Sequence, residues 1–443
     1  MRKSGTMLFI IIFLTTLCLI PSLPVQAEPK TIVVPDDYPT IEAAIGNATD
    51  GDSIFVKKGV YEENPLEINK TISLLGEGAD STKISFDPPY TEVTISIYEQ
   101  YIFYDEPIKV YAEGFEMSGF TIDTTGGDMV INGNGTRITE NQILTDLYVL
   151  GSHLSITENK FPYAVTIRGS NSKISTNIGY SMWIYGCFFD ISLNSISGSD
   201  AATCIYFEGN FSLLHHNNIT QAPYGRFSVN GKNNLVYRNI VDDVAFGLAL
   251  RGSNNTVYSN RITNSGIGLE NPESSNLFYA NYVADNGWGV NTGYNSTTAT
   301  IYHNNFVSNR YQVSTLFSGS YSTQYFDNGV EGNYWSDYRG KDADGDGIGD
   351  TPYVIDANRS DRYPLMFPFD IDNVDMVFPE WATFILNPQP TPSSTPELPS
   401  TPEPFPTTLV VASVVTVAVV SIGLIVYFKK RKRREHFSKG TES

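Results

Sequence analysis

The chain has few cysteines, the residues whose disulfides stabilise many small exported domains. Its 443 residues include three cysteines, five histidines and four tryptophans. Cys18 lies in a predicted signal peptide, so only Cys187 and Cys204 remain, which is too few for a disulfide framework. Stability must therefore come from a large core, which the 41% of hydrophobic residues can supply.

Basic residues are also scarce. The chain has 29 lysines and arginines against 48 aspartates and glutamates, and between residues 28 and 408 the counts are 20 and 46, a formal charge of about −26. A surface with this charge repels phosphate backbones, which excludes nucleic acid as a natural partner. It suits bound cations or simple solubility.

Both ends of the chain carry segments that concern targeting. Arg2 and Lys3 precede an apolar run from residue 7 to residue 20, and small residues that a signal peptidase accepts end at Ala27. Residues 1–27 are therefore predicted to be a signal peptide.

A second apolar run covers residues 409–428 and contains no charge. Twenty residues at about 1.5 Å each span roughly the 30 Å of a bilayer core. The basic cluster that follows at 429–434 is typical of a stop-transfer signal. We predict a transmembrane helix at 409–428 and a cytoplasmic tail at 429–443. The chain would then be a single-pass cell-surface protein with its N-terminal part outside the cell.

A six-residue phrase, apolar-x-x-Asn-x-apolar, recurs between residues 138 and 306. Its asparagines are 17 to 23 residues apart and are Asn141, Asn159, Asn177, Asn194, Asn217, Asn239, Asn260, Asn281 and Asn304. Runs with strand period and clusters of Gly, Ser and Asn separate the phrases. Each period is thus predicted to be two or three short strands joined by turns.

A period near 22 residues is typical of a leucine-rich repeat or of a parallel β-helix. The Leu-x-x-Leu-x-Leu frame of the first is missing, whereas the β-branched and aromatic residues of the second are present. We therefore predict an all-β fold, a right-handed, single-stranded parallel β-helix over residues 28–325. The asparagines should stack about 4.8 Å apart and bond to one another along a ladder, which is a structural role.

Three further segments are predicted around the coils. Thr40 should cap a short helix that covers the open N-terminal end of the core. Residues 326–380 should form a C-terminal module. Residues 381–408 are rich in Pro, Thr and Ser and should form an extended stalk.

Several segments resemble the NosD-type β-helix proteins of the pectin-lyase-like superfamily. They are IEAAIGNATDGDSIFVKKGVYEE, VYRNIV, VYSNRI and GNYWSDYRGKDADGDGIGDTPYVIDANRSDRYPLM. The likeness covers residues 31–367 and implies the same fold, one shared by archaeal-type cell-surface proteins without an assigned activity. NosD proteins themselves are linked to copper-centre maturation of nitrous oxide reductase, and the superfamily contains many polysaccharide lyases and hydrolases.

An acidic loop is the sharpest local motif. Asp342, Asp344, Asp346 and Asp350 occupy positions 1, 3, 5 and 9 of an EF-hand-like loop, and Ile348 offers a carbonyl at position 7. We predict that these five residues bind Ca²⁺. Position 12 is Tyr353 and not the usual bidentate acid, so another residue, Asp337 or Asp356, would have to complete the site.

Other candidate sites concern covalent modification. Cys187 and Cys204 each follow a ladder asparagine by ten residues, so they are predicted to lie on adjacent coils and to form a disulfide. Eight asparagines begin an N-x-Ser/Thr sequon and are predicted glycosylation sites: Asn47, Asn69, Asn134, Asn210, Asn218, Asn254, Asn295 and Asn358.

No catalytic set is identified. Asp242 and Asp243 are the adjacent acids of the regular coils, and we interpret them as turn residues. His215 and His216 are neighbours on a predicted strand, where their side chains should diverge, so copper is not expected.

The function predicted from these features is that of a binding or structural module at the cell surface, directed toward carbohydrate or envelope polymers. A polysaccharide lyase or hydrolase and a NosD-like periplasmic copper-handling accessory protein are the alternatives.

Overall fold

The structure is a computed structural model that describes residues 28–86, 107–124, 127–198, 202–270, 275–292, 298–314, 324–375 and 378–387. Contacts divide the chain into two units, Met1–Leu386 and Asn387–Ser443. The predicted signal peptide, membrane helix and cytoplasmic tail lie outside the described residues. No helix within the described ranges has the length and apolar character needed to cross a membrane.

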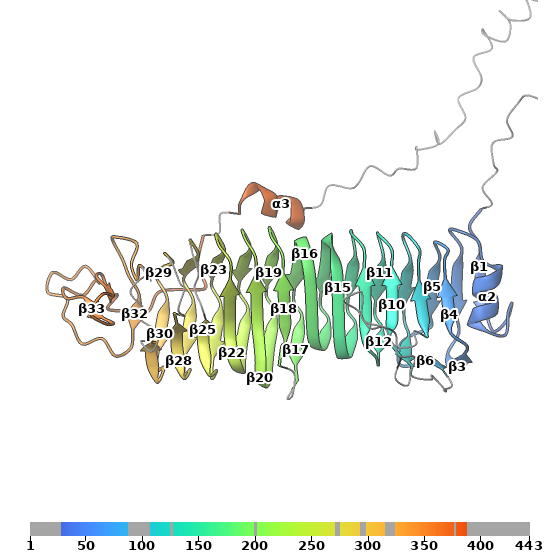
Figure 1. Ribbon diagram of the computed structural model, residues 1–443, viewed down its shortest axis with the longest axis horizontal. Coiled ribbons are helices and arrows are strands. Elements are labelled where there is room, and N and C mark those ends of the chain that lie inside the picture. The colour runs from blue at the N-terminus through green and yellow to red at the C-terminus, as the bar shows by residue number, and fades with distance from the viewer. Residues whose placement is uncertain are drawn as a thin grey trace, which may run out of the picture. The chain divides into compact units, whose positions relative to one another are not determined.

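Within the described residues, thirty-two strands belong to one parallel sheet. This sheet winds into a right-handed β-helix with three faces (Figure 1). Four long strands bend around corners and take part in two or three faces: β15 (Lys160–Ser175), β16 (Ile178–Ser192), β20 (Asn218–Asn230) and β22 (Ile240–Arg251). The fold class predicted from the repeat is therefore confirmed. We name the faces sheets A, B and C in the order in which the chain meets them.

Sheet A contains, besides parts of β15 and β16, the strands β1 (Thr31–Val34), β2 (Ser53–Val56), β5 (Ser73–Gly76), β8 (Glu116–Ser118), β11 (Arg137–Thr139), β14 (Ser155–Thr157), β19 (Leu213–His215), β21 (Leu235–Tyr237), β23 (Thr256–Tyr258), β26 (Leu277–Tyr279) and β29 (Thr300–Tyr302). Sheet B contains, besides parts of the four long strands, β3 (Gly59–Glu63), β6 (Thr82–Phe86), β9 (Thr121–Asp123), β12 (Gln142–Ile143), β17 (Ser195–Ser197), β24 (Arg261–Thr263), β27 (Tyr282–Ala284), β30 (Asn305–Val307) and β32 (Tyr334–Trp335). Sheet C contains, besides parts of the four long strands, β4 (Leu66–Ile68), β7 (Ile108–Val110), β10 (Met129–Asn132), β13 (Leu147–Leu150), β18 (Ile205–Glu208), β25 (Ile267–Glu270), β28 (Trp288–Asn291) and β31 (Tyr311–Val313).

The core fills the inside of the coils because alternate strand residues point inward. On sheet A, for example, Ile138, Ile156, Ile174 and Ile191 lie in register on successive coils, and all four are fully buried. Each inward side chain therefore packs on its equivalent one coil away, which is how a short repeat builds a continuous core.

The asparagine ladder is confirmed and lies at the corner between sheets A and B. In each step the backbone N–H and the side-chain amide of one asparagine donate to Oδ1 of the next, as in Asn239 to Asn260 at 3.0 and 2.9 Å. The ladder runs one step beyond the predicted repeat to Asn333 and ends at the buried carboxylate of Asp361, which accepts from the N–H of Asn333 at 2.7 Å.

The predicted N-terminal cap is confirmed as α2 (Ile41–Asn47). Thr40 is its N-cap, and the Thr40 hydroxyl accepts from the N–H of Ala43 at 3.1 Å. Ile41 and Ala44 enter the core, and Figure 1 shows α2 beside β1 at the N-terminal end of the coils. The helix thus covers apolar residues that no further coil would bury.

The described chain ends with the antiparallel pair β33 (Tyr353–Val354) and β34 (Ser360–Asp361) and with α3 (Glu380–Leu386). The prediction that the stalk begins at residue 381 is therefore wrong. Trp381 and Ala382 belong to an apolar cluster with Leu213 and Tyr237 on the outside of sheet A, so they gain apolar contacts that an extended stalk would not give. Residues 388–408 of the predicted stalk lie outside the described residues.

Candidate functional site

The acidic loop lies on the surface of the C-terminal module. Carboxylate oxygens of Asp342, Asp344 and Asp346 lie within 4.8 Å of one another. Asp342 accepts hydrogen bonds from the N–H groups of Gly347 at 2.9 Å and Gly345 at 2.7 Å. These bonds, that of Gly347 above all, hold the pKa of the Asp342 carboxyl below its ordinary value. The loop therefore brings three carboxylates together, and its backbone N–H groups favour the charged form of Asp342.

The remaining predicted ligands are placed differently. Asp350 does not belong to this group, and its carboxylate accepts from the N–H of Ala343 at 2.9 Å. Ile348 donates its N–H to Asp346 at 2.8 Å. The structure thus brings three of the four predicted carboxylates together, and calcium stays a prediction.

The residues considered for position 12 already have protein partners. The ring of Tyr353 stacks on Trp335 with centroids 4.4 Å apart, and its hydroxyl donates to Asp337 at 3.2 Å. Asp356 forms an ion pair with Arg359 at 2.6 Å. Tyr353 is thus part of the packing of the module.

The predicted disulfide is wrong. Cys187 lies opposite Ser170 on the preceding coil and beside Asn210 on the following coil, whereas the carbonyl of Cys204 accepts from the N–H of Met182. The pairing of β16 shifts from an offset of 17 residues with β17 to one of 23 residues with β18, so extra residues precede Cys204 and move it along the coil. Both cysteines are free thiols, and burial raises the pKa of Cys204 to about 11.

The sequons lie mostly at the surface. Six of their asparagines are exposed: Asn47, Asn69, Asn134, Asn218, Asn254 and Asn358. Asn210 is half-buried and accepts from the N–H of Lys232 at 2.7 Å, and Asn295 lies outside the described residues. Glycosylation itself stays a prediction.

The acids of the regular coils behave as turn residues. Asp242 accepts from the side chains of Thr263 at 2.6 Å and Asn264 at 2.7 Å. Asp243 is exposed and has a φ of +55°, a left-handed conformation that belongs to a corner. These contacts place the two acids in a corner of the coil, as the turn interpretation expects.

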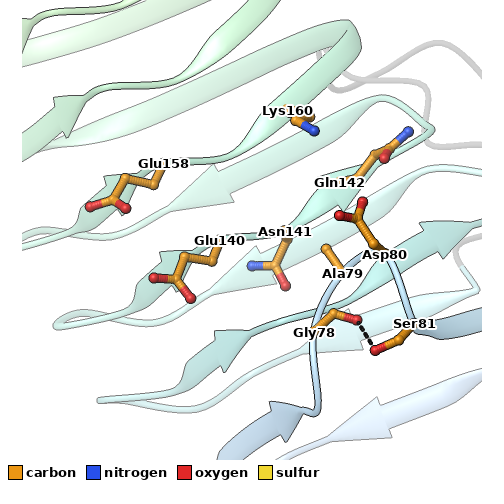
Figure 2. Close-up of a pocket in the computed structure, with 9 residues that line it drawn as sticks. All are labelled: Gly78, Ala79, Asp80, Ser81, Glu140, Asn141, Gln142, Glu158 and Lys160. Carbon is orange, nitrogen blue, oxygen red and sulfur yellow. Dashed lines mark hydrogen bonds between the residues drawn. The ribbon is translucent and has the colours of Figure 1, made fainter. Parts of the chain in front are cut away.

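A cavity of about 280 Å³ lies beside the turn at 78–81. It is lined by Gly78, Ala79, Asp80, Ser81, Glu140, Asn141, Gln142, Glu158 and Lys160. Figure 2 shows the carboxylates of Glu140 and Glu158 pointing in the same direction, away from Asp80 and Lys160. The two glutamates therefore do not face Asp80 across the cavity.

The expectation that the two neighbouring histidines diverge is wrong. His215 ends β19, and His216 has a φ of +53°, so strand alternation stops between them. Their Nδ1 atoms are 2.8 Å apart, and Nε2 of His215 is 3.0 Å from a carboxylate oxygen of Asp190. Burial and the neighbouring His215 lower the pKa of His216.

Stacked aromatic rings follow the outside of sheet A, where the chain itself covers them. Tyr237 and Tyr258 stack with centroids 5.1 Å apart, and both are buried. Phe378 packs against Tyr237 at 5.8 Å, and Trp381 packs against Phe211 at 5.8 Å. This column is therefore part of the packing of the C-terminal segment.

A second aromatic group lies on the outside of sheet C and stays partly exposed. Trp183 and Tyr185 of β16 face outward because Ile184 between them points into the core. Tyr206 of the next coil lies 4.9 Å from Trp183 and 5.7 Å from Tyr185, measured between ring centroids. The guanidinium of Arg168 lies 4.0 Å above the ring of Tyr185. We call Arg168, Trp183, Tyr185 and Tyr206 the aromatic platform.

Polar groups border the aromatic platform. The hydroxyl of Tyr206 donates to Glu208 at 2.8 Å and accepts from the side-chain amide of Asn230 at 2.9 Å. Burial, together with the carboxylate of Glu208, raises the pKa of Tyr206. Sequence reasoning missed this site because its residues come from different coils, whose register depends on insertions of variable length.

A family model matches more than half of the chain. The family described as "Periplasmic copper-binding protein (NosD)" matches residues 45–286 and 240–340. No curated protein sequence matches the chain.

Three solved structures give examples of the structural likeness. A mannuronic acid specific polysaccharide family 6 lyase from human gut microbiota has 14% identity and a TM-score of 0.43, and the match covers 69% of this chain and 86% of that one. The Agl-KA catalytic domain has 13% identity and a TM-score of 0.47, with coverages of 68% and 69%. The A-module of the Azotobacter vinelandii mannuronan C-5 epimerase AlgE6 has 13% identity and a TM-score of 0.38, with coverages of 64% and 91%. No function follows from these likenesses.

Proposed function

The chain belongs to the NosD family, and on that premise we propose that it is an exported binding protein that holds a polysaccharide chain on its aromatic platform. The observation that carries the proposal is the contact of Trp183 and Tyr185 with Tyr206 across two adjacent coils. The C–H groups of a sugar ring pack well on the electron-rich face of an aromatic ring. Three partly exposed rings in contact therefore offer adjacent places for sugar units.

The polar border supports the same ligand class. Sugar hydroxyls need hydrogen-bonding partners, and Glu208, Asn230 and Arg168 place an acceptor, a donor and a charged donor beside the rings. The platform lies on the flat outer side of a parallel sheet. A flat site suits a chain that extends beyond it, whereas a small ligand is normally enclosed in a cleft.

Tyr206 is poorly suited to act as the base of a lyase. A lyase needs a base, and a tyrosine serves as one only as phenolate. Burial and the carboxylate of Glu208 raise the pKa of Tyr206, so its hydroxyl keeps the proton at neutral pH. The hydroxyl then acts as a donor to Glu208 and helps to hold that side chain in place.

The setting of this binding site is part of the proposal. The family description is periplasmic, which agrees with export of the chain. The predicted membrane helix at 409–428 would hold the binding face at the cell surface, and calcium at Asp342, Asp344 and Asp346 would stabilise the C-terminal module.

Titration of the full-length protein with soluble neutral glycans and with uronate polymers tests the proposal. We expect Trp183→Ala and Tyr206→Ala to weaken binding about tenfold or more, because each removes a stacking surface worth about 1 kcal/mol beyond its area. Tyr325→Ala is the matched control, since Tyr325 is 49% exposed and lies near the C-terminal end of the coils. Equal affinities of all three variants and the unaltered protein would rule out the platform.

The enzyme alternative rests on Glu208, the carboxylate at the platform. Incubation with the same polymers would produce unsaturated uronates or new reducing ends if the protein were a lyase or a hydrolase. Product that disappears in Glu208→Gln, with binding retained, would replace the binding proposal by a catalytic one.

A further inference from the structure

A second set of aromatic side chains lies on the outside of sheet C, further along the β-helix than the aromatic platform. Trp288 of β28 and Tyr311 of β31 are paired in register, and their rings stack with centroids 6.0 Å apart. Phe246 of β22 lies two coils before Trp288 in the same row, with Ile267 between them. Phe246 and Trp288 are half-buried, and Tyr311 is 49% exposed. We call Phe246, Trp288 and Tyr311 the distal aromatic group.

Glycine explains why these rings face outward. In β22 one extra residue, Gly247, separates Phe246 from Leu248, where the pairing with β20 shifts by one position. Such a β-bulge re-aims the side chain beside it, so that Leu248 enters the core while Phe246 stays outside. The equivalent positions on the next two coils are also glycines, Gly268 and Gly289. A Cβ at Gly247 would lie 2.4 Å from the carbonyl oxygen of Gly268, so the close approach of the coils requires glycine.

The chemistry of the aromatic platform recurs at the distal aromatic group. The guanidinium of Arg226 lies 4.1 Å above the ring of Phe246, and the distance between Arg168 and its ring in the platform is 4.0 Å. Arg226 also pairs with the carboxylate of Glu270 at 3.5 Å, and the two side chains are 26% and 13% exposed. This contact is longer than a charge-assisted hydrogen bond, so the N–H groups of Arg226 remain available to a ligand. An aromatic ring, an arginine and a glutamate thus occur together twice on one face.

A continuous row of outward residues joins the two groups. From Trp183 and Tyr206 in the platform, the next residues in register are Ser228, Ala249 and Glu270. Ser228 and Ala249 have small side chains, so the row has no large side chain between Tyr206 and Glu270. The strands β16, β18, β20, β22, β25, β28 and β31 follow one another, so six spacings of about 4.8 Å give a face about 29 Å long. Figure 1 shows β16 to β28 in this order along the β-helix.

We propose that the aromatic platform and the distal aromatic group bind one polysaccharide chain, which runs along the axis of the β-helix over sheet C. This inference rests on the proposed function and adds to it a second contact region, the direction of the chain and a minimum length. A ligand made of repeating units fits two similar groups on one face, whereas a small ligand would occupy one of them. Binding at the second group is intramolecular once the first is occupied, so long chains bind more tightly than short ones.

Titration of the full-length protein with size-fractionated oligosaccharides tests the inference. The probes are fragments of the neutral glycan or uronate polymer whose binding Trp183→Ala weakens. We expect the affinity of the unaltered protein to rise about tenfold or more as the fragments become long enough to span about 29 Å. Trp288→Ala should remove this rise and leave the affinity for the shortest fragments unchanged, because it removes a ring of the distal aromatic group alone.

Tyr311→Ala is the second variant, because Tyr311 is 49% exposed and its removal should leave the melting temperature unchanged. Tyr325→Ala is the matched control. Tyr325 is equally exposed but pairs with Thr300 of sheet A, so this variant should keep the rise in affinity with length. An unchanged rise in folded Trp288→Ala and Tyr311→Ala would overturn the inference and leave the aromatic platform intact. If Trp183→Ala weakens the binding of no fragment, the proposed function itself fails.

Discussion

Replacement of Asn260 by leucine tests whether the amide ladder stabilises the coils. The Asn260 side chain is 1% exposed, and its amide donates to the carbonyls of Val236 at 2.9 Å and Tyr258 at 3.0 Å and to Asn281 Oδ1 at 2.9 Å. Its Oδ1 accepts from the N–H of Asn239 at 3.0 Å. Leucine makes none of these bonds and leaves that buried N–H without an acceptor.

The expected cost follows from these contacts. One buried unsatisfied donor costs about 1–3 kcal/mol, and each of the two hydrogen bonds that the two amide hydrogens of Asn260 can make at once costs about 1 kcal/mol more. We therefore expect Asn260→Leu to lower the free energy of unfolding by about 3–5 kcal/mol. Each coil contacts only its neighbours, so the loss should be concentrated in the coils around residues 236–283.

Urea unfolding gives the total change, and hydrogen exchange read by mass spectrometry locates it. Asn69→Leu in unglycosylated protein is the control, because Asn69 is exposed. Identical urea midpoints and exchange patterns for the two variants would show that the ladder bonds add nothing beyond the hydrogen bonds that water supplies.

Three further predictions concern backbone space, metal and pH. Gly209→Ala should lower the melting temperature strongly or prevent folding, because the added Cβ would clash with a glycine carbonyl on the preceding coil. Gly46→Ala in α2 is the control: its Cβ meets nothing within 4 Å, so the variant should be neutral or slightly stabilising. Millimolar calcium should protect residues 334–364 from proteolysis, and the double variant Asp344→Ala/Asp346→Ala should lose that protection. Equal digestion of the unaltered protein in calcium and in chelator would refute the calcium site. Burial raises the pKa of Asp361 from 3.8 to about 6, so the folded protein holds more protons than the unfolded chain between these values, and stability should fall as the pH rises through this window. The loss is about 3 kcal/mol at about 1.4 kcal/mol per pH unit, and urea midpoints at pH 4 and pH 7 should show it in the unaltered protein but not in Asp361→Asn.

The sequence predicts those parts of the fold that depend on residues close together in the chain and that recur in each coil. Inward residues such as Ile156 and Ile174 follow strand period, and the ladder asparagines mark one corner of every coil. Thr40 caps α2 through a bond to a residue three positions away, so its role also depends only on local sequence. These features need no knowledge of how far one coil is offset from the next.

Two further amide ladders recur in the sequence, but the six-residue phrase does not identify them. Asn234, Asn255 and Asn276 bond in series at the corner that precedes sheet A, and Asn286 bonds to Asn309 at the corner that precedes sheet C. They recur with the same spacing as the first ladder, but the six-residue phrase does not include them. A search for every recurring asparagine would have found all three corners.

Register between coils is what the sequence leaves undetermined. Cys187 and Cys204 have the same distance from their ladder asparagines, yet an insertion before β18 separates them in space. The aromatic platform depends on the same register, since it places Trp183 opposite Tyr206. Offsets of 17 to 23 residues are equally compatible with the inward pattern, because insertions in turns leave strand alternation unchanged.

The positions of His215 and His216 do not depend on the register between coils. They depart from strand alternation, in which neighbouring residues point to opposite faces. Alternation holds within a strand, but His216 is the corner residue, and a left-handed residue reverses the expected side. Tyr302 and His303 occupy the same two positions on a later coil, and their ring centroids are 4.7 Å apart, close to the 5.1 Å of His215 and His216. On both coils the two residues before the ladder asparagine therefore form a neighbouring pair, which strand alternation alone does not predict.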